Sequence, residues 1–329
     1  MSFRAYRIFI ENDKTVSRFV DLVQDDLDPG EVVIRAAYSS VNYKDALAAS
    51  GMAKVIRRSP CIGGIDVAGV VESSTDARFK TGDEVLVTGY DMGVAHDGGY
   101  SEHVRVPADW VVRLPRGMSL LESMVLGTAG FTAALALHRL EQNDLRPENG
   151  KVVVTGASGG VGSLAVVMLS HLGYHVVAIT GKDSEHDYLK SLGAAEVMSR
   201  SDIDMTSSRA LDKAQWAGAF DAVGGATLAW LTRTMKQNGV IASFGNAGGV
   251  ELNTTVMPFI LRGVRLIGID SAATAMPLRQ IIWRRLSTEL HTQKLGMLAH
   301  TITFDQLPQV FEKMLRGETR GRTVVKIAA

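Results

Sequence analysis

Cysteine is almost absent from this sequence of 329 residues, because Cys61 is the only one. A single thiol excludes an intrachain disulfide and any zinc site built from several cysteines. The 35 basic and 35 acidic residues cancel, so net charge favours neither nucleic acid nor an anionic membrane as a partner. The sequence shows no apolar run of membrane-spanning length and no signal-peptide core near Met1. These absences predict a cytoplasmic globular protein.

The most informative stretch that is present covers residues 152–162 and reads VVVTGASGGVG. Three valines predict a short buried strand, and the glycines after them predict a tight turn. Residues 163–173 then predict a helix, and residues 174–180 predict a second, parallel strand. Strand, glycine turn and helix in this order form a phosphate cradle, and the surrounding βαβ unit makes the signal far more specific than a glycine loop alone.

The residues after the second strand bear on which dinucleotide is bound. An NAD site places an acidic side chain here, on the ribose 2′-hydroxyl. This strand instead ends on Thr180 and is followed by Lys182, and a hydroxyl with an ammonium suits a 2′-phosphate. We interpret Asp183 or Ser184 as a helix N-cap. The sequence therefore favours NADPH, with Asp183 as a ribose ligand, or Lys182 as a solvated loop charge, as the alternatives.

The chain divides into three regions by its pattern of strands and helices. Residues 1–125 contain short strands punctuated by glycine and proline, which is typical of a barrel-like β domain. Residues 126–265 alternate strands and helices, which predicts a doubly wound parallel sheet. Residues 266–329 are expected to return to the first domain. The predicted class is α/β, with the active site in the cleft at the carboxyl ends of the parallel strands.

Motifs spread over nearly the whole chain carry a resemblance to a known family. They read SVNYKDAL at 40–47, GGIDVAG at 63–69, GTAGFTA at 127–133, TGASGGVG at 155–162, YLKSLGA at 188–194, TVMPFILR at 255–262 and GRT at 321–323. On these motifs the chain resembles the zinc-free, quinone-oxidoreductase-like branch of the medium-chain dehydrogenase/reductases. Within that branch it is most similar to the NADPH-dependent acrylyl-CoA reductases. The resemblance implies a GroES-like catalytic domain joined to a Rossmann NADP-binding domain.

The zinc ligands of related dehydrogenases are missing from the matching positions. Zinc-dependent relatives carry Gly-His-Glu where this chain has Gly64-Ile65-Asp66, and they carry a cysteine in the segment that here spans residues 42–45. The structural zinc lobe of those relatives needs four cysteines. We therefore expect no metal site.

The resemblance implies reduction of a C=C bond conjugated to a thioester, most closely acrylyl-CoA to propanoyl-CoA. Hydride reaches the β-carbon, negative charge develops on the carbonyl oxygen, and the α-carbon takes a proton. The candidate catalytic residues are Tyr43, which lines the cofactor site in the family, and its neighbours Asn42 and Asp45. By family match the other cofactor-binding residues are Ser158, Gly159, Gly160, Val161, Thr180, Gly181, Lys182, Arg200, Asn246, Ile260 and Ser271.

Three further expectations and their alternatives remain open. Lys54, Arg57 and Arg58 could meet the phosphates of a CoA substrate, although a solvated charge run is an equal alternative. The resemblance implies a homodimer formed through the strand at 264–270. The alternatives in function are an NADPH:quinone oxidoreductase of the same fold, a short-chain dehydrogenase, which the absence of Tyr-x-x-x-Lys opposes, and a non-catalytic nucleotide sensor.

Overall fold

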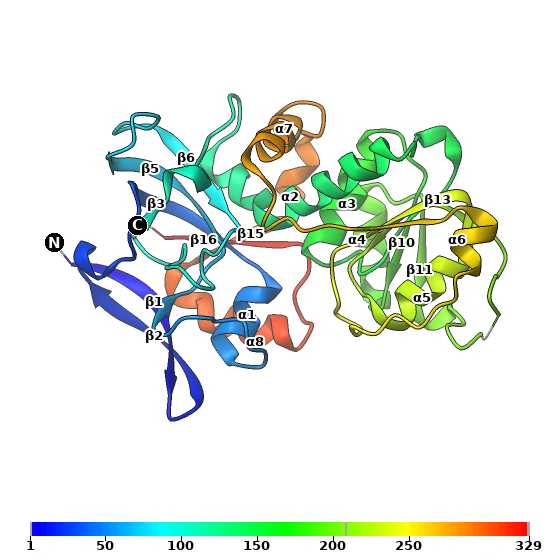
Figure 1. Ribbon diagram of the computed structural model, residues 1–329, viewed down its shortest axis with the longest axis horizontal. Helices are drawn as coiled ribbons and strands as arrows, with labels where there is room; N and C mark the ends of the chain where they lie inside the picture. Colours follow the sequence, from blue (N-terminus) through cyan, green and yellow to red (C-terminus); the bar gives the residue numbers. More distant parts are fainter. Residues whose placement is uncertain (1, 208, 328–329) are drawn as a thin grey trace. The chain divides into compact units, whose positions relative to one another are not determined.

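A computed structural model describes residues 2–207 and 209–327 and divides them into two compact units (Figure 1). Unit 1 comprises Met1–Ala129, Ser271–Ser287 and Gly296–Ala329, and unit 2 comprises Gly130–Asp270 and Thr288–Leu295. The predicted domain boundaries fell at 125 and 265, so the units end a few residues later. The segment 288–295, expected with the C-terminal region, belongs to unit 2.

Unit 1 is built on two sheets. The larger has the order β15-β16-β3-β5-β6-β8, with β7 also paired to β3, and the smaller has the order β2-β1-β4. The strands of the larger sheet are β3 (Val32–Val41), β5 (Asp66–Ser74), β6 (Glu84–Thr88), β7 (His103–Val106), β8 (Val112–Arg113), β15 (Ala299–Thr303) and β16 (Arg322–Lys326). Those of the smaller sheet are β1 (Phe3–Glu11), β2 (Lys14–Leu22) and β4 (Cys61–Ile62).

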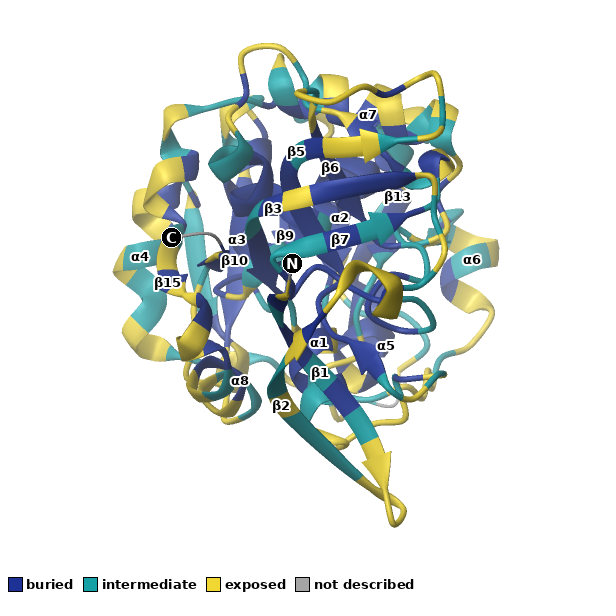
Figure 2. Cartoon of the chain, turned by 90° about the vertical axis from the view of Figure 1, so that its left-hand side faces the viewer, coloured by how far each residue is buried: buried dark blue, intermediate teal, exposed yellow. Residues whose placement is uncertain are grey.

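Strands from the two ends of the chain share the larger sheet. Strand β16 pairs antiparallel with β3, and Thr323 lies opposite Val41. The inner parts of β3, β5 and β6 are buried, whereas the tip of the β1–β2 hairpin is exposed (Figure 2). The helices of this unit are α1 (Tyr43–Ser50), α7 (Met276–Ser287) and α8 (Leu307–Leu315). The C-terminal strand thus completes the sheet from which α1 departs.

Unit 2 is a six-stranded parallel sheet with the order β11-β10-β9-β12-β13-β14. Its strands are β9 (Val152–Val154), β10 (Val176–Thr180), β11 (Glu196–Ser199), β12 (Trp216–Asp221), β13 (Met235–Ser243) and β14 (Arg265–Gly268). Its helices are α3 (Gly160–His171), α4 (His186–Leu192), α5 (Gly225–Thr234) and α6 (Met257–Arg262). The valines of β9 are fully buried between β10 and β12, as a central parallel strand requires. The sheet confirms the predicted doubly wound unit.

The segment labelled α2 (Leu120–Gln142) consists of two helical halves that meet at Gly127, which confirms the prediction of two helices with this glycine between them. The two halves run together across a kink at Gly127, whose backbone is non-helical (φ 49°, ψ −154°). By length and composition α2 is long and apolar enough to cross a membrane, so the expectation that no such run exists was wrong. Within the structure 78% of its most apolar window is buried, as in the core helix of a globular protein.

Short 3-10 helices connect the larger elements. They are η1 (Gln24–Asp26), η2 (Ala108–Trp110), η3 (Pro147–Asn149), η4 (Asp183–Glu185), η5 (Arg200–Asp202), η6 (Gln293–Met297) and η7 (Phe304–Gln306). Helix η4 begins three residues after the end of β10, and η5 begins directly after the end of β11. They therefore matter for the site described next.

Candidate functional site

The glycine-rich turn of unit 2 carries the chain from β9 into α3. Helix α3 begins at Gly160 with Gly159 as its N-cap, and the turn closes through a hydrogen bond of 3.0 Å from Gly159 N to Gly156 O. The first N–H groups of a helix have no partner within it, and the helix dipole adds positive charge there. The turn therefore forms an anion-binding cradle at the carboxyl edge of the sheet.

Two glycines of this cradle cannot carry a side chain. Gly156 has φ +60°, a conformation that L residues rarely adopt. A Cβ on Gly162 would lie 2.4 Å from Gly156 O, so the helix could not approach the turn so closely. The backbone is thus kept bare where a pyrophosphate would approach, which is the fit that a dinucleotide requires.

The carboxyl ends of β10 and β11 bring two cations to the same edge. Thr180 and Ser199 are paired in the parallel register, so the residues after them are neighbours. The guanidinium of Arg200 lies against Gly181, and a Cβ on that glycine would be 3.1 Å from Arg200 Nη2. Lys182 N donates to Thr180 Oγ1 at 3.1 Å, and that hydroxyl lies 3.3 Å from Ser158 Oγ. The structure therefore joins the predicted cradle to the predicted 2′-phosphate end.

The interpretation of Asp183 or Ser184 as an N-cap was wrong. Asp183 is the first residue of η4, and no side chain caps either η4 or α4. Helix α4 follows directly, and Glu185, the last residue of η4, is its N-cap residue. Asp183 is exposed and caps neither helix, so its carboxylate stays an alternative ligand for the ribose beside Lys182 and Arg200.

Asp221, which the sequence analysis did not single out, ties this edge together. It ends β12 and is fully buried, and its carboxylate accepts a hydrogen bond from Thr155 Oγ1 at 2.7 Å. It also accepts from the N–H groups of Val223 at 3.2 Å and Gly224 at 3.0 Å. Burial raises the pKa of this carboxyl group above its ordinary value. Asp221 thereby joins the glycine-rich turn to the next turn along the edge. In the sequence, the only sign of this role was an aspartate that stands between a strand and two glycines.

The remaining predicted cofactor residues are divided between the units. Asn246 follows the carboxyl end of β13, at the same edge as the cradle. Ile260 lies on α6 and is 69% exposed. Tyr43 and Ser271 belong to unit 1, so only the unit 2 residues are brought together within one compact unit.

In unit 1, Tyr43 is the first residue of α1, and its side chain is 49% exposed. Asn42 precedes it as the N-cap. Asp45 is only 3% exposed and accepts hydrogen bonds from Asn42 N at 2.9 Å and Ile65 N at 3.0 Å. These contacts fix the start of α1, so the structure supports a positioning role for Asp45, and its catalytic role stays a prediction.

A second buried carboxylate, Asp66, lies beside this helix start. It accepts a hydrogen bond from Asn42 Nδ2 at 2.8 Å, and from Thr128 through its N–H at 3.0 Å and its hydroxyl at 2.6 Å. The hydroxyl of Ser40 also donates to Asp66, and it accepts from Arg322 Nη2 at 2.9 Å. Ser40 thus connects the buried guanidinium to the buried carboxylate. We call Ser40, Asn42, Asp45, Asp66 and Arg322 the buried polar network.

The kink in α2 is fitted to this network. A Cβ on Gly127 would lie 2.6 Å from Asp66 Oδ2 and 2.7 Å from Ser40 Oγ. The Arg322 guanidinium also donates to Val125 O at 3.0 Å, two residues before the kink. A single network therefore fixes both the N-terminus of α1 and the break in α2. The motifs that contain Asp66 and Arg322 could be recognised in the sequence. Because the two residues lie far apart in the chain, no sequence pattern indicated that they belong to one cluster.

Stability should depend on pH through Asp45. Burial, and then the neighbouring Asp66 charge, raise the pKa of Asp45 from 3.8 to about 7. The folded protein then binds this proton more tightly than the unfolded chain, so the stability contributed by the proton is complete below about pH 4 and is lost as pH rises through about 7. Urea unfolding at pH 5 and pH 8 should show this loss. Asp45→Asn should flatten it, and an unchanged slope in that variant would exclude Asp45 as the titrating group.

Both arginines of the basic cluster at 54–58 form ion pairs with carboxylates of unit 1. Arg57 pairs with Asp91, and Arg58 pairs with Asp28 at 2.5 Å and Asp97 at 3.1 Å. Asp97 is buried, so the Arg58 pair belongs to the packing of unit 1. This arrangement weakens the expectation that these arginines meet CoA phosphates, and Lys54 stays an untested candidate.

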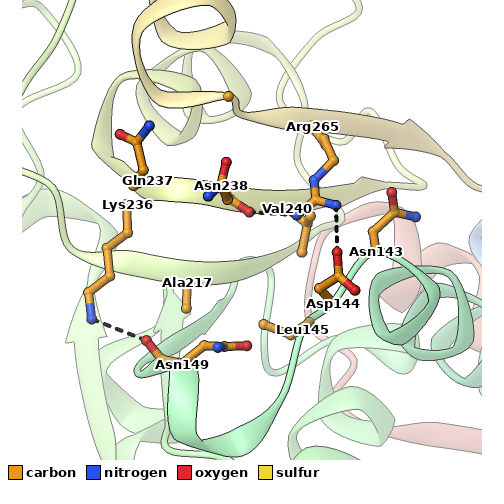
Figure 3. A pocket seen from close by; sticks show the side chains of 11 residues that line it. Asn143, Asp144, Leu145, Asn149, Ala217, Lys236, Gln237, Asn238, Val240 and Arg265 are labelled. Carbon is orange, nitrogen blue, oxygen red and sulfur yellow. Dashed lines mark hydrogen bonds and ion pairs between the residues drawn. The ribbon is translucent and has the colours of Figure 1, made fainter.

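A cavity of about 660 Å³ opens at the opposite, amino-terminal edge of the unit 2 sheet (Figure 3). Arg265 and Asp144 approach to 3.4 Å within it, and Lys236 Nζ donates to Asn149 O at 3.4 Å. No predicted cofactor residue lines this cavity. The side chains of Asp144, Lys236 and Arg265 thus already bind one another or the backbone.

Two family models match the chain. The one described as an alcohol dehydrogenase GroES-like domain matches residues 28–116, and the one described as a zinc-binding dehydrogenase matches residues 160–286. The chain is 46% identical over 319 residues to the acrylyl-CoA reductase AcuI of Ruegeria pomeroyi, covering 97% of both chains. It is 50% identical over 304 residues to the putative quinone oxidoreductase YhfP of Bacillus subtilis, covering 92% of both.

Solved structures match over the full chain. The yhdH oxidoreductase of Salmonella enterica in complex with NADP has a TM-score of 0.96 at 46% identity, covering 99% of this chain and 100% of that one. The YhfP protein, solved with NAD bound, has a TM-score of 0.96 at 47% identity, covering 99% of each chain. Two similar proteins with this fold have thus been solved with different dinucleotides, one with NADP and the other with NAD.

The model that matches residues 160–286 is described as zinc-binding, but the described residues of this chain offer no set of zinc ligands. In the described ranges 2–207 and 209–327, no group of three or more His, Cys, Asp and Glu side chains could hold a metal ion. Burial raises the pKa of Cys61 to about 12, which disfavours the thiolate that zinc needs. At the Gly64-Ile65-Asp66 motif, both Asp66 oxygens are engaged by hydrogen bonds. From its sequence relatives, its domain matches and its fold, the chain belongs to the medium-chain dehydrogenase/reductase superfamily.

Proposed function

We propose that this protein is an NADPH-dependent reductase of the C=C bond of a short enoyl-CoA, with acrylyl-CoA as its substrate and propanoyl-CoA as its product. The observation that carries the proposal is the 46% identity to acrylyl-CoA reductase AcuI over 97% of both chains. The cradle and cations of unit 2 support it independently, because they fit a dinucleotide phosphate and a 2′-phosphate.

The residues proposed for the cofactor divide by the part of NADPH that they hold. Ser158, Gly159, Gly160 and Val161 bind the pyrophosphate at the start of α3. Thr180, Gly181, Lys182 and Arg200 surround the 2′-phosphate, and Asn246, Ile260, Ser271 and Tyr43 bind the nicotinamide half. When bound, the nicotinamide supplies the hydride that reduces the double bond.

The chain's own contribution to the chemistry is to stabilise charge on the thioester oxygen, while the α-carbon takes its proton from solvent or from the Tyr43 phenol. Tyr43 carries an exposed phenol at the first position of α1, where the helix dipole is positive. Its hydroxyl donates a hydrogen bond to the carbonyl oxygen as negative charge develops. Asn42 and Asp45 hold the helix start, and Asp66 holds Asn42, so the buried polar network positions the phenol.

Replacing Tyr43 with phenylalanine should lower kcat roughly ten- to hundredfold, since one charge-stabilising donor is lost. The KM for NADPH should change less than about threefold. Stopped-flow measurement of NADPH oxidation in single turnovers separates the chemical step from product release. Tyr38→Phe on β3 is the matched control and should behave as the parent. Unchanged kcat in Tyr43→Phe would leave this side chain a packing residue.

The function itself is tested by following NADPH oxidation with acrylyl-CoA, crotonyl-CoA and a benzoquinone under identical conditions, with NADH as the control cofactor. We expect the highest kcat/KM for acrylyl-CoA with NADPH. Activity on the quinone alone would contradict the proposal and support the quinone oxidoreductase alternative, which the name of YhfP favours. Binding of NADPH with no turnover of any substrate would support the sensor alternative.

The protein is further proposed to act in the cytoplasm as a homodimer. Strand β14 is an edge strand of the unit 2 sheet, so its free side can pair with a second copy. Light scattering should give twice the 35.4 kDa chain mass. Elution as a monomer at micromolar concentration would remove this part of the proposal.

A further inference from the structure

Arg279 on α7 is completely buried, and its guanidinium donates to five oxygen atoms of unit 1. Nη1 donates to Thr88 O at 2.7 Å and to Thr88 Oγ1 at 3.0 Å. Nη2 donates to Ser271 O at 3.1 Å and Ala272 O at 3.0 Å, and Nε donates to Thr274 O at 3.4 Å. One side chain therefore joins the end of β6 to the carbonyl groups of residues 271–274, which we call the 271–274 segment.

The same segment is also held by the turn after β6. Tyr90 N donates to Ala272 O at 3.0 Å, and a Cβ on Gly89 would lie 2.9 Å from Ala272 Cα. The Tyr90 ring lies 4.3 Å from the Arg279 guanidinium and stacks on Trp110 with centroids 5.3 Å apart. A buried cation, two aromatic rings and a bare glycine thus enforce one conformation of the 271–274 segment.

This segment has a particular place in the chain. It begins three residues after Gly268, the last residue of β14, and the carboxyl end of β14 lies at the cradle edge of the unit 2 sheet. It is also where the chain re-enters unit 1. Its residues, Ser-Ala-Ala-Thr, have small side chains, so the shape presented to a ligand is set mainly by the backbone.

We propose that Arg279 is the positioning residue that fixes the 271–274 segment for binding of the nicotinamide half of the cofactor. The inference rests on the proposed function only in that Ser271 is taken as a cofactor contact. Lysine cannot replace arginine here, because a compact ammonium cannot span acceptors on two separate segments as the planar five-donor fork does. Arg279 therefore influences the cofactor through the backbone that it holds.

The test compares Arg279→Lys with Arg284→Lys, an exposed position on the same helix. Dissociation constants are measured for NADPH and for adenosine 2′,5′-bisphosphate, which carries the 2′-phosphate end but no nicotinamide. Hydrogen exchange of the peptide covering residues 271–275 is measured in the cofactor-free protein. We expect Arg279→Lys to weaken NADPH binding at least tenfold, to leave the bisphosphate within about twofold, and to accelerate exchange in this peptide. Arg284→Lys should match the parent in all three.

An equal loss of affinity for NADPH and for the bisphosphate would overturn the proposal, and so would an unchanged affinity for NADPH. Either outcome counts whether or not hydrogen exchange of the peptide increases. None of these readouts needs turnover, so a parent protein that binds NADPH but reduces no enoyl-CoA would refute the proposed reaction and leave this test intact. If Arg279→Lys does not fold, Gly89→Ala replaces it. Its Cβ would lie 2.9 Å from Ala272 Cα and displace that residue, and the same selective loss of NADPH affinity is expected.

Discussion

Replacing Arg200 with alanine should raise the KM for NADPH ten- to hundredfold and leave the KM for NADH within about twofold. The guanidinium of Arg200 lies against Gly181, at the end of the strand that follows the cradle. A charge-assisted hydrogen bond contributes about 1.5–3 kcal/mol, and each 1.4 kcal/mol corresponds to about tenfold in affinity. NADH lacks the 2′-phosphate, so it loses nothing when this cation is removed.

Two companion variants make the result specific to the 2′-phosphate. Lys182→Asp should act in the same direction as Arg200→Ala, since it replaces the other cation with a repelling carboxylate. Gly181→Ala should also raise the KM for NADPH, because the new Cβ would lie 3.1 Å from Arg200 Nη2 and displace the guanidinium. Lys190→Ala, an exposed cation on α4, is the control and should leave both KM values unchanged.

The outcome matters because similar chains are described with different dinucleotides. The Salmonella enterica yhdH structure holds NADP and the Bacillus subtilis YhfP structure holds NAD, at 46% and 47% identity to this chain. Asp183, beside Lys182, is exposed and is not used as a helix cap. If Arg200→Ala raised both KM values equally, Arg200 would be removed from the 2′-phosphate site and Asp183 would become the candidate ribose ligand.

Features encoded over a short stretch were predictable from the sequence. The run of valines, glycines and helix formers at 152–173 contains its whole strand–turn–helix signal within one window, and the structure places β9, the turn and α3 there. Strand β1 was not predicted, because arginines at positions 4 and 7 interrupt its apolar pattern. The strand forms despite these arginines because β1 pairs with β2 along the full hairpin. The hydrophobic pattern of β1 alone does not reveal this pairing.

Features that depend on distant residues could not be predicted in the same way. Gly127 was predicted as the boundary between two helices and the structure places a kink there, but the hydrogen bonds from the N–H and the hydroxyl of Thr128 to Asp66 could not be predicted. Asp45 looks like a neighbour available to Tyr43, yet the fold buries it against Ile65. Arg322 is 282 positions from Ser40 in the chain. Only the pairing of β16 with β3 brings them together.

The largest effect on stability is expected from Arg322→Met. Burial lowers the pKa of the Arg322 guanidinium, but it stays the cation that faces Asp45 and Asp66. Removing one partner from a buried charged cluster costs about 3–5 kcal/mol, because the charge left behind has neither water nor its counterion. Arg322→Met should therefore lower the free energy of unfolding by that amount. Lys326→Met, at the exposed end of the same strand, is the control and should cost less than about 1 kcal/mol.

A double-mutant cycle separates the charge interaction from lost packing. Asp66→Asn removes the negative charge and keeps a side chain of similar shape, so Arg322→Met combined with Asp66→Asn should be less destabilised than the sum of the single variants. The difference measures the coupling that Ser40 transmits between guanidinium and carboxylate. Simple additivity would mean that the two side chains stabilise β16 and α2 independently. The buried polar network would then lose its role as the common support of the Tyr43 helix and the α2 kink.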